Sequence, residues 1–217
     1  MQTTIYLVRH GETAGNRVRR YQTYDTPLSD EGREQARRVA GRLAGEGPFA
    51  ALYTSDLART LETAATIGQE LGLAAALEPR LRELDVGDWK GTLYEEIERR
   101  FPRQRERWIA GGGLDRLPGA AGESTSDVRQ RVLSAFDEIA ARHAGERVIA
   151  VSHGWALAVL VAALHGWDQA ETFREQRLHF DNTAVMVFEL DADGARRCAL
   201  LNCTHHLAAI AHNDGSP

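Results

Sequence analysis

The sequence predicts an α/β fold with a mostly parallel central sheet, helices on both faces and an antiparallel edge strand. Short runs rich in β-branched and aromatic residues alternate with longer stretches whose apolar residues recur at helical spacing. Such alternation is typical of parallel strands joined by helical crossovers. Near the end of the chain, two strand-like runs flank Asp193-Gly194, which predicts a hairpin at the edge of the sheet.

The first third of the chain gives the clearest alternation. Its predicted elements are a strand at 3–8, a helix at 29–45, a strand at 49–55, a helix from Leu57 to Leu71 and a short strand at 74–77. Ser29 can cap the first helix, and Gly45 stands at its end. For the second helix we expect Ser55 or Asp56 as the cap.

The pattern loosens between residues 81 and 120. Two helical pieces are expected there, broken near Pro102 and by three consecutive glycines. The order then returns with a helix at 124–143, a strand at 147–152, a buried helix at 155–164 and strands at 183–190 and 196–204. We therefore expect a single domain over residues 1–217, with a small helical lid insertion at about 84–122.

Composition narrows the functional classes. The chain has 217 residues, 43% hydrophobic residues and a net charge of -5, which argues against a nucleic-acid or membrane-surface partner. Neither a signal peptide nor a membrane-spanning run is recognisable, so a cytoplasmic location is expected. The two cysteines, Cys198 and Cys203, have no metal-ligand spacing. Oligomeric state is open, with a homodimer possible.

Two short motifs share the same pattern. Each has a buried strand, one polar residue, then histidine and glycine, in Arg9-His10-Gly11 and in Ser152-His153-Gly154. Ligands of open α/β sheets bind at the carboxyl ends of the strands, so His10 and His153 are expected to meet there. A glycine after each histidine permits a sharp turn and a close backbone approach.

Basic side chains accompany these histidines. Arg9 precedes His10, and Arg59 lies early in a helix, whose N-terminus attracts anions. Cations close to a site repel a metal ion and attract an anion, so no metal is expected. Asn16 and Gln22, in the loop after the first strand, add neutral donors suited to an oxyanion.

Taken together, these motifs resemble the histidine phosphatase superfamily, also called the phosphoglycerate mutase-like family. The matching pieces, in the order of the family, are Arg9-His10-Gly11-Glu12-Thr13 with Asn16, TPLSDEGREQA at 26–36, TSDLARTLETA at 54–64, LRELDVGDWKG at 81–91 and SHG at 152–154, and Asn182 also fits. The resemblance implies a histidine acid-type phosphatase that needs no cofactor and acts on a small phosphomonoester.

The resemblance also implies a role for each residue. His10 is expected to be the nucleophile that becomes phosphorylated, and Glu83 the proton donor. Arg9, Arg59 and His153 are expected to hold the phosphoryl oxygens. Further substrate contacts are expected from Asn16, Gln22, Thr23 and Gly154. Thr23 departs from the family, which commonly has glycine at this position.

The chemistry fits these residue types. A phosphomonoester carries about two negative charges, which repel an anionic nucleophile but not a neutral imidazole. In the transition state the charge lies on three equatorial oxygens, which Arg9, Arg59 and a protonated His153 can stabilise. Glu83 can protonate the leaving oxygen and later accept a proton from water.

Two alternatives to a phosphatase remain. A phosphoglycerate mutase runs the same first half-reaction, but mutases of this family resemble one another in Glu-Arg-His-Tyr-Gly, where this chain has Glu83-Leu84-Asp85-Val86-Gly87. A non-catalytic phospho-ligand binder could also keep the scaffold. Several aromatic and basic residues of the lid could contact substrate, or could form a solvated helix face: Trp89, Tyr94, Arg99, Arg100, Phe101, Arg103, Arg105, Arg107 and Trp108.

Overall fold

A computed structural model describes residues 2–174 and 178–210, and its centre is a six-stranded sheet. The strand order is β3-β2-β4-β1-β5-β6, in which β3, β2, β4 and β1 are parallel and β5 and β6 are antiparallel to their neighbours. The strands are β1 (Thr3–Arg9), β2 (Ala51–Thr54), β3 (Ala75–Leu77), β4 (Arg147–Ser152), β5 (Val185–Leu190) and β6 (Arg196–Cys203). The predicted fold class and hairpin edge are confirmed.

The long helices also lie where the sequence places them. The helices are α1 (Ala14–Arg17), α2 (Asp30–Ala44), α3 (Ala58–Leu71), α4 (Tyr94–Arg100), α5 (Pro102–Ala110), α6 (Thr125–Arg142), α7 (Gly154–Leu164) and α8 (Gln169–Arg174). Three short 3-10 turns are η1 (Pro79–Leu81), η2 (Gly87–Trp89) and η3 (His205–Ile210). Helices α1 and α8 were not expected, because four and six residues are too short to show a helical period.

One predicted helix cap is wrong. Ser29 caps α2 as expected, since its side chain accepts the N–H of Gly32. The N-cap of α3 is Leu57, which makes no side-chain cap bond, and not Ser55 or Asp56. Ser55 instead bonds to His153 at 2.7 Å, and Asp56 forms an ion pair with Arg82. Both side chains are therefore engaged in tertiary contacts that a local pattern does not reveal.

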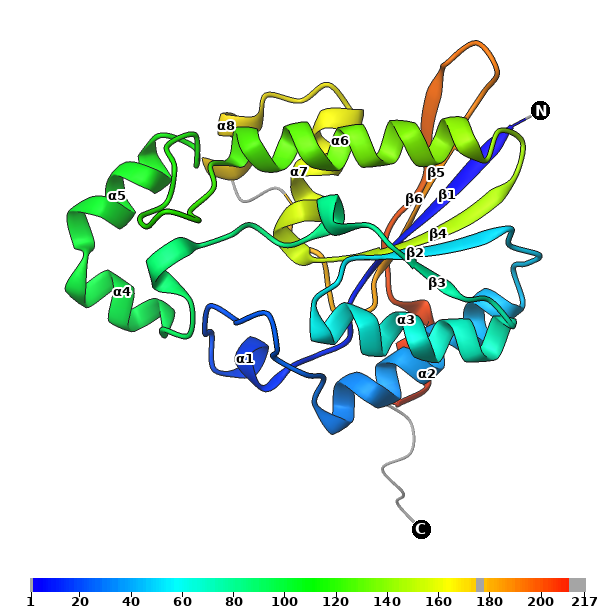
Figure 1. Ribbon diagram of the computed structural model, residues 1–217, viewed down its shortest axis with the longest axis horizontal. Coiled ribbons are helices and arrows are strands. Elements are labelled where there is room, and N and C mark those ends of the chain that lie inside the picture. Colours follow the sequence, from blue (N-terminus) through cyan, green and yellow to red (C-terminus); the bar gives the residue numbers. More distant parts are fainter. Residues whose placement is uncertain (1, 175–177, 211–217) are drawn as a thin grey trace.

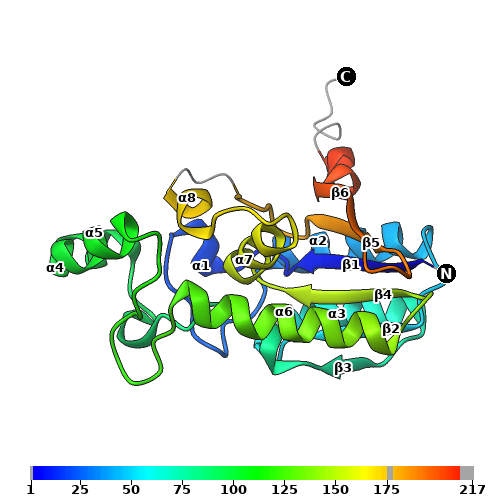
Figure 2. The ribbon, with the colours of Figure 1, turned by 90° about the horizontal axis from the view of Figure 1, so that it is seen from above.

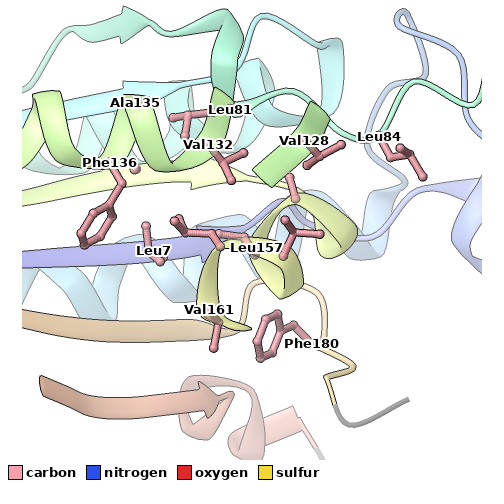
Figure 3. Packing of buried hydrophobic residues seen from close by; sticks show 14 of the residues in the cluster. Leu7, Leu81, Leu84, Val128, Val132, Ala135, Phe136, Leu157, Val161 and Phe180 are labelled. Carbon is pink, nitrogen blue, oxygen red and sulfur yellow. The ribbon is translucent and has the colours of Figure 1, made fainter. Parts of the chain in front are cut away.

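Helices cover both faces of the sheet, as the alternating side chains of β1 show. Ile5 and Leu7 belong to a core cluster with residues of α6 and α7, whereas Tyr6 and Val8 belong to a second cluster with residues of α2 and α3. This alternation is the two-residue period of a strand buried on both faces. In Figure 1, α6 lies above the strands and α2 and α3 below them. Figure 3 shows the first cluster, with Leu7 facing Leu157 and Phe136.

The same topology places the two histidine motifs side by side. Strands β1 and β4 are adjacent and parallel, with Arg9 opposite Ser152. The N–H of His10 donates to the Ser152 carbonyl at 3.0 Å. His10 and His153 therefore leave the sheet together at its carboxyl end.

The segment from 84 to 122 lies beyond that end of the sheet. Figures 1 and 2 both show α4 and α5 projecting past the strands on the side opposite the N-terminus. The start of the segment is attached to the loop after α1 by an isolated bridge between Arg20 and Leu93. No helix in residues 2–174 or 178–210 is long and apolar enough to cross a membrane.

Candidate active site

A cleft of about 500 Å³ opens at the carboxyl end of the sheet. It lies between the loop after β1, the segment 83–94 and helices α5, α7 and α8. Seven residues singled out from the sequence line it: Arg9, His10, Asn16, Gln22, Arg59, Glu83 and Gly154. His153 and Thr23 do not line it, for different reasons given below.

His10 is held in one orientation and one protonation state. Its Nδ1 lies 2.7 Å from the Gly11 carbonyl, which can only accept, so Nδ1 carries the proton and Nε2 keeps its lone pair. Burial lowers the pKa of His10 well below its usual value, and the nearby Arg59 and Arg9 lower it further. The ring is therefore neutral at physiological pH, as a nucleophile toward a dianion must be.

The backbone around His10 is fixed on several sides. The His10 carbonyl accepts from Asn182 Nδ2 at 3.0 Å and from the N–H of Thr183 at 3.3 Å. A Cβ on Gly11 would lie 2.4 Å from the Gly32 carbonyl oxygen, so the turn after the histidine must pass close to the start of α2. Glycine is the residue that permits this approach.

His153 lies directly behind the cleft. It is fully buried, and the centroid of its ring is 5.2 Å from that of His10. Nε2 bonds to Ser55 Oγ at 2.7 Å, while Nδ1 is buried with no partner in the described part of the chain. Burial, Arg59 and His10 lower the pKa of His153 well below its usual value. His153 is thus neutral in the free site, and a bound dianion would favour the protonated form that is expected from the sequence in the transition state.

Two cations line the same cleft. Arg59 is 3% exposed, whereas Arg9 is half-buried with its Nε atom fully covered. One nitrogen of each donates to a backbone carbonyl, Arg9 to Phe180 and Arg59 to Thr23, but the Nε of each is buried without a partner among the described residues. Neither forms an ion pair within residues 2–174 and 178–210.

The charge on these arginines is offset only at longer range, chiefly by the Glu83 carboxylate, and not by a direct ion pair in the described part of the chain. Burial lowers the pKa of Arg59 to about 10, which still leaves it charged at neutral pH. A buried cation without a counter-ion is costly, and an anionic ligand that accepts from both guanidinium groups removes that cost. Gly154 lies next to Arg9, since a Cβ there would be at van der Waals distance, 3.4 Å, from Arg9 Nε.

Glu83 sits between the cleft and the start of α7. Its Oε1 accepts the N–H groups of Leu84 at 2.9 Å and Ala156 at 3.0 Å, and its Oε2 accepts that of Trp155 at 3.1 Å. Each carboxylate oxygen has two lone-pair directions, and on Oε1 both are occupied by N–H donors. Oε2 accepts a single N–H, so it is the oxygen that can also hold the proton for a leaving group.

The three residues of the loop after β1 have different surroundings. Asn16 uses Oδ1 to accept from the backbone and hydroxyl of Thr13, both at 3.0 Å, which leaves Nδ2 available to a ligand. Gln22 lines the cleft, and its Oε1 is buried without a partner in the part of the chain that the structure describes. The Thr23 hydroxyl bonds to Asp25 at 2.6 Å, and only its carbonyl reaches the site, through Arg59. Thr23 is thus an indirect contact.

Several residues of the site were missed from sequence. Ser55 was considered only as a helix cap, although it anchors His153. Of the lid residues named above, only Tyr94, Arg105 and Trp108 line the cleft. The other lining residues not singled out include Arg19, Arg20, Tyr24, Lys90, Trp155, Gln169 and Phe173. Lys90 lies within the motif at 81–91 and Trp155 follows the motif at 152–154, whereas Gln169 and Phe173 carry no motif signal. In the described part of the chain, no three His, Cys, Asp or Glu residues lie close enough to hold a metal.

The buried neutral histidines make stability sensitive to acid. Below the usual histidine pKa of about 6.5, the unfolded chain takes up protons that folded His10 and His153 do not, so stability falls as pH falls. We expect the free energy of unfolding to drop by about 1 kcal/mol per group for each pH unit below that value. Denaturant unfolding between about pH 7 and pH 5 measures it, above the range in which carboxylates titrate.

Matched variants separate these groups from the rest of the chain. His10→Gln should flatten the pH dependence, whereas Arg129→Lys, an exposed substitution that removes no histidine and keeps the charge, should leave it unchanged. A stability that does not vary with pH in the unsubstituted protein would contradict the burial argument.

Comparisons with known proteins point to one family. The family model of the histidine phosphatase superfamily (branch 1) matches residues 5–204. Phosphoglycerate mutase-like protein 4 of Arabidopsis thaliana is 36% identical over 188 residues, which cover 86% of this chain and 79% of that protein.

Solved structures give the same result. Bacillus stearothermophilus YhfR superposes with a TM-score of 0.85 at 35% identity, covering 94% of this chain and 99% of that one. A mycobacterial glucosyl-3-phosphoglycerate phosphatase, solved with VO3, superposes with a TM-score of 0.80 at 30% identity, covering 92% of this chain and 99% of that one.

Proposed function

Because the chain belongs to the histidine phosphatase superfamily, we propose that it is a phosphomonoester hydrolase of the histidine acid type. We propose that it acts without a metal through a phosphohistidine at His10, on a small phosphorylated metabolite. One observation carries the proposal: a neutral imidazole whose Nε2 keeps its lone pair lies beside the guanidinium groups of Arg9 and Arg59, and neither arginine forms an ion pair within residues 2–174 and 178–210. That arrangement suits a phosphoryl group in reach of a nucleophile.

In the first half-reaction, Arg9 and Arg59 bind the phosphoryl oxygens, and His153 becomes protonated as the dianion enters. His10 Nε2 attacks phosphorus while the bond to the leaving oxygen breaks and its electron pair stays on that oxygen. Glu83 supplies the proton that makes the leaving group an alcohol. Each step uses a group that lines the cleft or lies directly behind it.

In the second half-reaction, water replaces the alcohol. Glu83, now ionised, takes a proton from water, whose oxygen attacks phosphorus. The bond between phosphorus and His10 Nε2 breaks, its electron pair returns to the imidazole, and inorganic phosphate leaves. The segment 84–122 would act as a lid over the cleft in this single domain, and Tyr94, Arg105 and Trp108 would be its substrate contacts.

Phosphoryl transfer to a second hydroxyl is the other candidate, since a relative is named phosphoglycerate mutase-like. The wall beside Glu83 favours hydrolysis. Leu84 and Val86 line the cleft there, each 7% exposed, and their side chains offer no polar group to hold a second acceptor hydroxyl. An assay that counts released phosphate and isomerised phosphoglycerate in the same sample separates the two activities.

Metal removal gives a prediction of its own. We expect hydrolysis of a nitrophenyl phosphate to survive exhaustive EDTA treatment, because Arg9, Arg59 and His153 supply the positive charge that a metal would otherwise provide. Vanadate should inhibit competitively, since it is an anion of the same shape. Activity that disappears with EDTA and returns with added magnesium or zinc would contradict this expectation.

A further inference from the structure

Glu83 lies in a segment that has no regular secondary structure. Residues 82–86 follow η1 and precede η2, so no helix or strand ladder holds them. Hydrogen bonds from side chains hold this backbone instead. Arg131 Nη1 donates to the carbonyls of residues 80 and 82 at 2.8 and 2.6 Å, and Arg131 Nη2 donates to the Glu83 carbonyl at 2.9 Å. Ser152 Oγ donates to the intervening Leu81 carbonyl at 2.7 Å. Four successive carbonyls are thus bound by two side chains.

Arg131 is itself fixed by Glu123. Its Nε and Nη2 each donate to a Glu123 oxygen at 2.8 Å, in a bidentate pair whose side chains are 17% and 19% exposed. Glu123 reaches the same segment from the other side. Its Oε2 accepts the N–H of Asp85 at 2.9 Å, and its own N–H donates to the Asp85 carbonyl at 2.9 Å. Arg131 and Glu123 therefore hold the backbone on both sides of Leu84 by hydrogen bonds, at Glu83 and at Asp85.

From these contacts we infer that Arg131 and Glu123 are positioning residues for the proton transfer by Glu83. The inference rests on the proposed function, since it assigns them to the step in which Glu83 protonates the leaving oxygen. Neither residue lines the cleft. They act by fixing the backbone from which the carboxyl group projects, so that it meets both the leaving oxygen and the start of α7.

The geometry requires arginine and not merely a positive charge. Arg131 bonds three carbonyls and one carboxylate at once, which its planar group with five N–H donors can do. A lysine has three donors at a single point and cannot span these acceptors. Arg131→Lys keeps the positive charge but cannot make all of these hydrogen bonds. The variant therefore tests whether they position Glu83.

The test measures phosphoenzyme formation in a single turnover on two substrates. An alkyl phosphate needs its leaving oxygen protonated, whereas a nitrophenyl phosphate does not. Because displacement of a catalytic group by about 1 Å can cost on the order of 10²-fold, Arg131→Lys should slow the alkyl substrate by about 10²-fold and the nitrophenyl substrate by much less. Glu123→Gln should shift the ratio in the same direction. Arg129→Lys, on the exposed face of the same helix, should change neither rate.

A double-mutant cycle completes the test. If Arg131 acts through Glu83, then Arg131→Lys should cause no further loss of alkyl selectivity in a Glu83→Gln background. Equal slowing of both substrates, or additive losses, would show a structural role only and overturn the inference. Should Arg131→Lys fail to fold, the same cycle with Glu123→Gln decides the question.

Phosphoenzyme formation precedes the choice of acceptor, so this experiment separates the two proposals. A protein that forms the phosphoenzyme but releases no phosphate contradicts the proposed hydrolase and still permits the cycle. An unsubstituted protein that forms no phosphoenzyme from either substrate contradicts both.

Discussion

Replacing His10 by alanine should lower kcat by about 10⁴-fold or more, as removal of a nucleophile does in other enzymes that form covalent intermediates. The structure leaves no substitute in its place. His153 is the nearest imidazole, but it lies behind the cleft, and its Nε2 is bonded to Ser55. Initial rates on a nitrophenyl phosphate measure the loss.

His153→Ala is the matched variant, because it removes the other buried histidine. It should slow turnover through loss of transition-state stabilisation and still accumulate phosphoenzyme. The nucleophile stays neutral because burial, Arg59 and Arg9 depress the pKa of His10 well below its usual value. Phosphoenzyme formation should therefore not fall with the usual histidine titration as pH is lowered toward 5. A His10→Ala variant with substantial activity, or a rate that falls with that titration, would contradict the assignment.

Glu83→Gln should have an effect that depends on the leaving group. General acid catalysis contributes roughly 10²–10⁴-fold, and an alkyl alcohol needs nearly all of it, whereas nitrophenolate leaves unprotonated. The variant should form phosphoenzyme slowly from a sugar phosphate and quickly from a nitrophenyl phosphate. With the aryl substrate it should then stall as phosphoenzyme, because the base that activates water is also missing. Single-turnover rates on both substrates measure the difference.

Equal slowing of both substrates would mean that Glu83 only supports the site, through its bonds to the N–H groups at the start of α7. The neighbouring carboxylates are poor replacements as the acid. Asp85 bonds to Lys90 at 2.6 Å and to the N–H of Gly87 at 2.8 Å, and neither Asp85 nor Asp88 lines the cleft. A Glu83→Asp variant keeps the carboxyl group on a shorter side chain. It therefore shows whether the rate depends on the position of the acid or only on its presence.

The sequence predicted those parts of the site that depend on strand ends. His10 and His153 follow adjacent parallel strands, and a buried strand that ends in histidine and glycine is visible in a single sequence. Arg59 was singled out from its place early in a helix, whereas Glu83 was identified only through the resemblance to the family, because taken alone it is an ordinary loop carboxylate. Their importance arises from tertiary contacts: burial for Arg59 and the N–H groups of α7 for Glu83.

The wrong helix cap has a tertiary cause. Ser55 has the residue type and position of a helix cap, yet its hydroxyl faces His153, a residue 98 positions away in the chain. The expected substrate contact of Thr23 stays a prediction, and its side chain bonds within its own turn. The protonated His153 expected in the transition state also stays a prediction, because burial and Arg59 lower the pKa of His153 in the free site. Arg131 belongs to none of the recognised motifs. It bonds to backbone carbonyls, and a sequence pattern does not show such contacts.

The central claim is that water takes the phosphoryl group from His10. A single turnover of substrate with radiolabelled phosphate, quenched in alkali where phosphohistidine survives, tests it directly. The account predicts acid-labile label on the peptide that contains His10, which decays to inorganic phosphate at a rate consistent with kcat when no second alcohol is present. Label on another residue, or label on His10 that leaves only when phosphoglycerate is added, would contradict it.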